Sequence, residues 1–133
     1  MKRTLAAIAL ACALVAPAAA AEKTMSADFT GDWCYGDGYD AQTKETNYRL
    51  PSWMPEDMPC DKAKILSIRR YDILFHATDE SCEIVNARYT SESGHTGTRY
   101  TARITAKCSP DGEWKPKPKT FVFYRYKGNL YVK

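Results

Sequence analysis

The sequence has no apolar run of about 20 residues, which is the length that a helix needs to cross a membrane. It holds only two histidines, His76 and His95, and it lacks both a G-x-S-x-G nucleophile elbow and a glycine-rich phosphate loop that leads into a helix. The usual marks of hydrolases and of nucleotide-binding enzymes are therefore missing. We predict a protein without enzymatic activity, without a cofactor and without a transmembrane segment in its mature chain.

Closely spaced cysteine pairs are also missing. Structural zinc sites favour ligand pairs such as C-x-x-C, whereas the four cysteines after residue 21 lie more than twenty residues apart. We therefore predict disulfides and no metal site. If Cys82 pairs with Cys108, the remaining possibility for Cys34 is Cys60, unless both stay free.

The sequence begins with the features of a secretory signal peptide. Lys2 and Arg3 provide a basic start, residues 5–15 are apolar, and residues 18–21 are the small residues that a signal peptidase requires. Cleavage after Ala21 leaves residues 22–133 as a single domain, in the periplasm or secreted, where disulfides form. A retained anchor and a lipoprotein acylated at Cys12 are the alternatives, and the shortness of the apolar run counts against both.

The segment from Cys82 to Cys108 predicts a β-hairpin. Two alternating runs flank the polar residues 91–97, which are rich in turn formers and predict a longer loop centred on His95. Folding the chain there places Cys82 opposite Cys108 and Ile84 opposite Ala106. This register predicts a cross-strand disulfide between the two cysteines.

The second strand of this hairpin supports the same register. Because side chains alternate along a strand, one face carries an apolar series and the other a series that includes three basic residues. Asn86 and Arg88 interrupt the apolar face on the first strand. The apolar series is Tyr100, Ala102, Ile104, Ala106 and Cys108, and the other is Arg99, Thr101, Arg103, Thr105 and Lys107.

The rest of the chain predicts further short strands. Residues 22–27 are expected to be a flexible lead-in, residues 36–45 a polar loop, and the three prolines of residues 51–60 exclude a central strand. Strands are expected at residues 29–35, 46–50, 63–70, 73–77, 120–126 and 130–133. The fold class is therefore all-β, a small antiparallel meander barrel of six to eight strands with two disulfides.

Two groups of residues are candidates for binding. The first is basic and could meet a polyanion, although a solvated strand face is the alternative. The second lies in the proline-rich loop, where an aromatic ring and two methionines suit an interface, although the loop could also close one barrel end. The basic group is Arg99, Arg103, Lys107, Lys115, Lys117 and Lys119, and the loop group is Trp53, Met54 and Met58.

Residues 29–34, FTGDWC, resemble the Gly-x-Trp motif on the first strand of lipocalins and related small barrels. The resemblance implies that Trp33 closes one barrel end against a basic side chain from the last strands, which by position is Arg125 or Lys127. In size and export the chain resembles the small bacterial protease inhibitors with a lipocalin-like barrel. Their N-terminal inhibitory arm has no distinctive match here, and the second motif of full lipocalins is absent.

Together these features favour an exported, non-enzymatic binding module. A hydrolase inhibitor and a carrier of a small apolar ligand are the two leading versions. Large residues favour a filled barrel over an open one, and they are Phe75, Tyr100, Phe121 and Phe123. The alternative is an envelope protein that binds polyanions or has a structural role. The expected partner is a periplasmic or extracellular protein or an anionic glycan, and not a nucleic acid.

Overall fold

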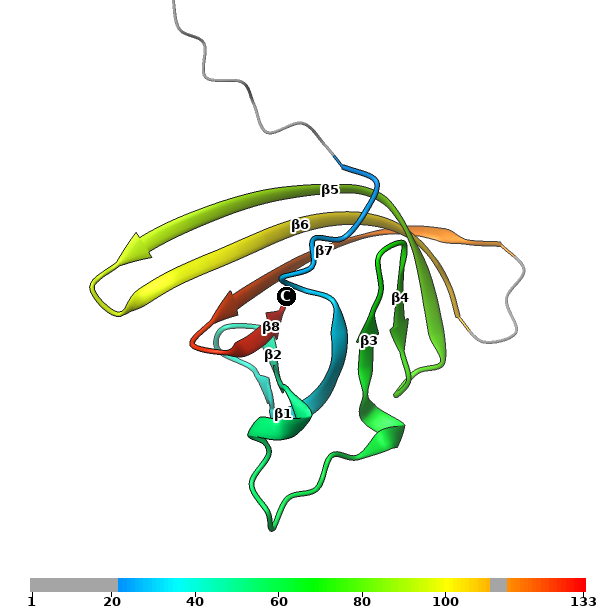
Figure 1. Ribbon diagram of the computed structural model, residues 1–133. Helices are drawn as coiled ribbons and strands as arrows, with labels where there is room; N and C mark the ends of the chain where they lie inside the picture. Colours follow the sequence, from blue (N-terminus) through cyan, green and yellow to red (C-terminus); the bar gives the residue numbers. More distant parts are fainter. Residues whose placement is uncertain (1–21, 111–114) are drawn as a thin grey trace, which may run out of the picture.

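The computed structural model describes residues 22–110 and 115–133, which form a closed antiparallel barrel (Figure 1). The predicted all-β barrel and both predicted disulfides are confirmed. The predicted signal peptide lies outside the described residues, among which no helix could span a bilayer. The strands are β1 (Gly31–Asp40), β2 (Glu45–Arg49), β3 (Leu66–Ile68), β4 (Asp72–Phe75), β5 (Glu80–Gly94), β6 (Gly97–Ser109), β7 (Lys117–Tyr126) and β8 (Asn129–Val132), with 3-10 turns η1 (Pro51–Trp53) and η2 (Lys62–Lys64).

The barrel closes because the chain crosses over from β2 to β3. Strands β3 to β8 follow one another as a meander, but β2 pairs with β8 and β1 pairs with β3. The proline-rich segment between β2 and β3 therefore passes across β1, near the point where Trp33 faces Leu66. Cys34 is fully buried but lies outside the core cluster, because it alternates with the inward-facing Trp33. Its disulfide to Cys60 attaches the crossover segment to β1.

Large side chains fill the barrel. Alternate positions of each strand point inward. The ring of Phe121 stacks on Phe123 with centroids 5.7 Å apart and meets Phe75 at a tilt with centroids 5.3 Å apart. Close packing of this kind is the main source of stability in a small domain. The largest fully buried side chains include Trp33, Phe29, Phe123, Leu66, Ile68, Ile73, Ile104 and Leu130.

The predicted register of the β5–β6 hairpin holds from Cys82 to Ile84 and is displaced by one residue beyond that point. Cys82 faces Cys108 with a Cα–Cα distance of 4.0 Å, and the predicted pairing continues to Ile84. A bulge follows between Ile84 and Asn86, and it moves the pairing by one residue. Ala87 therefore faces the core in place of Asn86, which removes the polar interruption that the unbulged register required.

The predicted loop at residues 91–97 is wrong. Both strands continue through it until Gly94 pairs with Gly97, so that His95 and Thr96 form a two-residue turn. Gly97 has a φ of +133°, a conformation that glycine adopts without strain. The turn formers near the tip therefore end the hairpin tightly instead of opening it into a loop.

The predicted polar loop at residues 36–45 is also wrong. Strand β1 continues to Asp40, and an irregularity between Tyr35 and Gly38 lets the chain keep pairing with β2. A Cβ at Gly36 would lie 2.5 Å from the side-chain oxygen of Asn47 and 3.1 Å from its backbone oxygen, so a larger residue would have to displace Asn47. The exposed turn is limited to residues 41–44.

The predicted flexible lead-in is fixed to the barrel. Glu22 and Ala87 exchange both backbone hydrogen bonds, at 2.9 and 2.6 Å. The hydroxyl of Tyr89 accepts from the backbone N–H of Ser26, and Met25 is only 4% exposed. The apolar side chain of Met25 supplies the burial that a polar lead-in would lack, and this explains why the segment docks.

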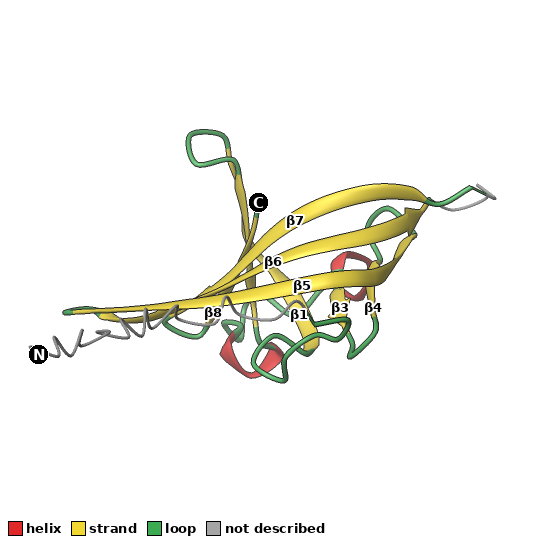
Figure 2. Ribbon diagram, turned by 90° about the horizontal axis from the view of Figure 1, so that it is seen from above, coloured by secondary structure: helices red, strands yellow, loops and turns green. Residues whose placement is uncertain are grey.

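The outer part of the β5–β6 hairpin projects from the barrel (Figures 1 and 2). Strand β4 pairs only as far as Glu83, and β7 pairs with β6 only as far as Tyr100. We call residues 88–101 the arm. Its two strands pair with each other over their full length, but they extend beyond β4 and, for the most part, beyond β7. Tyr100, which belongs to the predicted apolar face, is consequently 44% exposed.

Candidate functional site

The outer face of β6, β7 and β8 carries a stacked cluster of one arginine and two tyrosines. The guanidinium of Arg99 lies 3.8 Å from the ring centroid of Tyr124, which stacks on Tyr131 at 4.6 Å with the planes 13° apart. Arginine over a tyrosine face is a favourable cation–π arrangement. A groove of about 460 Å³ lies along this cluster, and we call it the tyrosine–arginine groove; its lining is Thr90, Glu92, Arg99, Thr101, Arg103, Val122, Tyr124 and Lys133.

Glu45 on β2 holds the cluster in place. The Tyr124 hydroxyl donates a short hydrogen bond to the Glu45 carboxylate, which also lies 4.0 Å from the ammonium of Lys133. Burial, followed by this hydrogen bond, raises the pKa of Tyr124 far above its ordinary value of 10.0. The phenol therefore stays a neutral donor at any physiological pH, and the ring keeps one orientation.

The charges of this face are not balanced locally. Arg88 on β5 lies directly opposite Arg103 on β6, and both side chains are exposed. Like charges directly opposite each other destabilise a strand pair. In residues 22–110 and 115–133, neither guanidinium has an ion pair, and Glu92, opposite Arg99, is an acid on the same face of β5 as Arg88. The outer face therefore has an excess of positive charge around Arg88 and Arg103.

The predicted basic group is divided between two faces. Arg99, Arg103 and Lys107 share the outer face of β6, as predicted, and Lys107 lies opposite Glu83. Lys117 and Lys119 pair in register with Cys108 and Ala106, whose side chains point to the opposite, core side. Lys119 also forms an ion pair with Glu80 at 2.8 Å. Lys115 is exposed just before β7. The six residues therefore do not form one patch.

The predicted group in the proline-rich loop is only partly exposed. Trp53 is 58% exposed and Met58 50%, while Met54 is half-buried. One side of the Trp53 ring packs on the β7–β8 turn, since a Cβ at Gly128 would come within 2.8 Å of it. The loop therefore keeps an exposed aromatic edge, and its role in binding stays a prediction.

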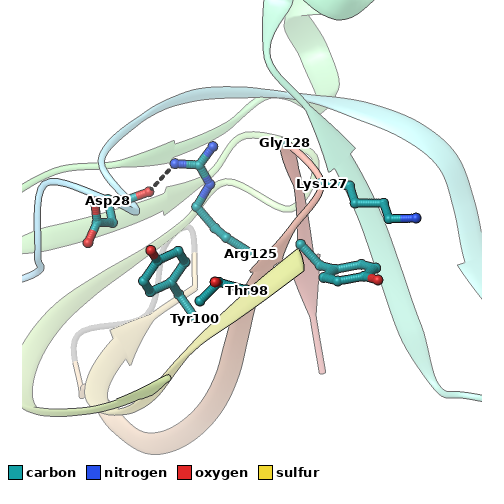
Figure 3. A pocket seen from close by; sticks show the side chains of 7 residues that line it. Asp28, Thr98, Tyr100, Arg125, Lys127 and Gly128 are labelled. Carbon is teal, nitrogen blue, oxygen red and sulfur yellow. Dashed lines mark hydrogen bonds between the residues drawn. The ribbon is translucent and has the colours of Figure 1, made fainter. Parts of the chain in front are cut away.

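A second hollow, of about 170 Å³, is lined by Asp28, Tyr100 and Arg125, together with the β7–β8 turn (Figure 3). Arg125 lies over the Trp33 ring at 5.1 Å and donates from Nη1 to the backbone oxygen of Asp28 at 2.8 Å. Of the two basic residues that the resemblance implied, Arg125 therefore packs on the tryptophan, while the ammonium of Lys127 lies over Tyr126. Because Arg125 is already held by these contacts, its main role here is structural.

A serine, a histidine and an aspartate meet on the outer face of β1, β3 and the end of β4. The Ser67 hydroxyl is buried, donates to the Asp32 carboxylate at 2.7 Å and lies 3.1 Å from Nε2 of His76. In a catalytic triad the imidazole lies between the serine and the acid and takes the serine proton. Here the serine lies between the other two and donates its hydrogen bond to the acid. The cluster connects three strands and is not arranged as a nucleophile.

Glu80, Cys82 and Cys108 also lie close together, within the 4.8 Å that a shared metal ion would require. Both sulfur atoms are joined in a disulfide, and the carboxylate accepts from Lys119. The cluster therefore supplies no thiolate ligand, and its two cysteines form the disulfide that joins β5 to β6.

Sequence reasoning missed Tyr124, Tyr131, Glu45 and Lys133. The outward positions of β7 and β8 could have indicated the two tyrosines, but their contact depends on the pairing of Tyr124 with Tyr131 across these strands. Glu45 lies on β2, and a simple meander would not place β2 beside β8. No family model, curated protein or solved structure matches the chain.

Proposed function

We propose that the protein is an exported, non-enzymatic binding module that captures an acidic ligand, such as an anionic glycan, in the tyrosine–arginine groove. The observation that carries this proposal is the convergence of Arg99, Arg103 and Lys133 on a groove with a stacked aromatic pair at its side. Arginine binds carboxylate, sulfate and phosphate groups through paired hydrogen bonds. The two disulfides support an oxidising, periplasmic or secreted location.

The barrel interior supports this assignment over a carrier of small apolar ligands. A barrel of eight strands holds a ligand only if its inward side chains leave room. Here Trp33, Phe123 and Leu130 are at most 1% exposed and occupy the interior. A surface site is therefore favoured, and the resemblance to small Gly-x-Trp barrels remains a proposal that the Arg125–Trp33 contact supports.

The test is the affinity of the exported protein for a sulfated glycan, with heparin as the probe. We expect saturable binding in titration calorimetry that weakens as salt is raised, because exposed charges are screened. Arg99→Gln combined with Arg103→Gln is expected to raise the dissociation constant at least tenfold. Arg69→Gln combined with Arg70→Gln is the matched control, because it also removes two charges and both arginines are exposed on the β3–β4 turn, away from the groove.

Equal losses in the groove variant and in the Arg69→Gln/Arg70→Gln control would mean that only net charge matters, and would overturn the groove assignment. The hypothesis that the protein inhibits a hydrolase is tested separately. Capture of one hydrolase from a periplasmic extract, equally by the wild type and by the Arg99→Gln/Arg103→Gln variant, would replace the acidic ligand with a protein bound elsewhere, for example at the projecting arm.

A further inference from the structure

The outer edge of β5 is unpaired along the arm. On the side away from β6, β4 pairs with residues 80–83 of β5 and Glu22 pairs with Ala87. Beyond Ala87, no described strand pairs with residues 88–94 on this side, and Figure 1 shows β5 as the outermost strand of the arm. An open strand edge is a template for pairing with another strand.

The hydrogen-bonding groups of this edge can be assigned from the Glu22 bridge. Because Ala87 exchanges both hydrogen bonds with Glu22, its N–H and C=O point away from β6. These groups alternate along an antiparallel strand, so those of Tyr89, Ser91 and Ser93 point to the same open edge. The edge has no proline, and its bulge lies before Ala87. Proline and a bulge, two devices that block an edge, are therefore absent from it, and its two charged side chains, Arg88 and Glu92, are of opposite sign.

We propose that β5 of a second copy of this chain pairs with this edge, antiparallel and about a two-fold axis at Ser91. The Glu22 bridge ends the available edge on one side and the turn after Gly94 ends it on the other, so Ser91 is its middle residue. Ser91 then faces the partner's Ser91, and Tyr89 faces the partner's Ser93. This register makes about six backbone hydrogen bonds.

The charges of the arm fit this register. With Thr90 opposite the partner's Glu92, the side chain of Arg88 is the diagonal neighbour of that carboxylate, at a distance that long side chains can span. Each Arg88 lies opposite Arg103 in its own chain and would gain an acid from the partner. The pairing therefore offsets the like-charge contact in both copies.

The two-fold axis is perpendicular to the sheet, so the outer faces of both copies lie on the same side. Paired residues of antiparallel strands share a face, and the arm residues of the outer face are continuous with the tyrosine–arginine groove. The dimer is isologous and closes after two copies, as a two-fold interface must. It does not depend on ligand binding in the groove.

The test is the mass of the exported protein in solution. An interface of one strand pair is small, so we expect a concentration-dependent monomer–dimer equilibrium in sedimentation velocity between about 1 and about 500 µM. Ser91→Pro removes an N–H that faces the open edge and should raise the dimer dissociation constant at least tenfold. Ser91→Ala keeps that N–H and should leave the equilibrium unchanged.

A charge exchange tests the register without proline. Arg88→Glu should weaken the dimer at least fivefold, and Arg88→Glu combined with Glu92→Arg should restore it, because each diagonal contact again joins opposite charges. Sedimentation velocity measures both, and circular dichroism checks that each variant is folded. A monomer at every concentration would overturn the proposal, as would a dimer that neither Ser91→Pro nor the charge exchange affects.

Discussion

The two halves of the β5–β6 hairpin share one alternating pattern but have different surroundings. In the barrel half, Ala102, Ile104 and Ala106 are fully buried and the disulfide joins the two strands. In the arm, Tyr100 continues the same face and is 44% exposed. Alternation therefore predicts which face a side chain takes, while the presence of a neighbouring layer decides whether that face is buried. The barrel half stabilises the fold, and the arm is available for contacts.

The largest expected effect comes from the core side of the barrel half. Ile104→Ala removes a fully buried side chain that the surrounding barrel cannot replace, and should lower the free energy of unfolding by about 2–5 kcal/mol. Urea unfolding followed by tryptophan fluorescence measures this value. Thr105→Ala, one residue along on the outer face, is the control and should change stability far less. Equal effects would contradict the assignment of faces.

Removing the Cys82–Cys108 disulfide from the barrel half should have the next largest effect on stability. Cys82→Ala with Cys108→Ala opens a link between residues separated by 26 positions in the chain. Loss of this constraint should cost about 3 kcal/mol of stability. Thermal unfolding of the oxidised double variant against the wild type measures it. A loss below about 1 kcal/mol would show that the strand pairing and core packing already hold this part of the hairpin.

Tyr124 gives a smaller effect that depends on pH. Its hydrogen bond to Glu45 should make Tyr124→Phe about 1 kcal/mol less stable near neutral pH. The raised pKa of Tyr124 means that the folded protein holds a phenol proton that the unfolded chain releases above pH 10.0. Its contribution is therefore complete below pH 10.0 and is lost as the pH rises further.

The measurement is urea unfolding of the wild type and Tyr124→Phe from pH 8 upward. The wild type should lose stability more steeply above its unfolded-state pKa, and the two curves should converge. Parallel curves across this range would show that Tyr124 titrates alike in both states and would remove Glu45 as its fixed acceptor.

The smallest effect is expected at the arm. Tyr100→Ala removes a large ring from the same strand and face as Ile104, yet it should change the free energy of unfolding by only about 0.5 kcal/mol. Chemical unfolding checks this directly. A cost as large as that of Ile104→Ala would mean that the hollow beside Arg125 closes over Tyr100 and that the arm is part of the core.

Much of the structure of the β5–β6 hairpin could be predicted from the sequence. The spacing of Cys82 and Cys108 with the apolar series of β6 was sufficient for the register near the disulfide. Asn86 and Arg88 were the local sign of the bulge, but an interrupted face does not say at which residue the extra position falls. The docking of Met25 also escaped prediction, because it depends on a gap between distant strands.

The candidate site was less accessible to sequence reasoning for a related reason. Tyr124, Arg99 and Glu45 come from three strands, and their contact depends on the β2–β8 pairing, which a simple meander would not contain. Strand alternation shows that Lys119 and Arg103 lie on opposite faces of the sheet only when the β6–β7 register is known. Local patterns identify faces, and neighbours across the sheet need the topology.

The Glu22–Ala87 bridge has a practical consequence for handling the protein. If the chain is cleaved after Ala21, as we propose, a peptide fused ahead of Glu22 would begin beside the open edge of β5, because Glu22 pairs with Ala87. A fusion after Lys133 would start in the wall of the groove. An affinity tag at either terminus would thus compete with the surfaces being assayed. An insertion between Ala41 and Gln42, both exposed in the β1–β2 turn, avoids both surfaces and is the better position for a label.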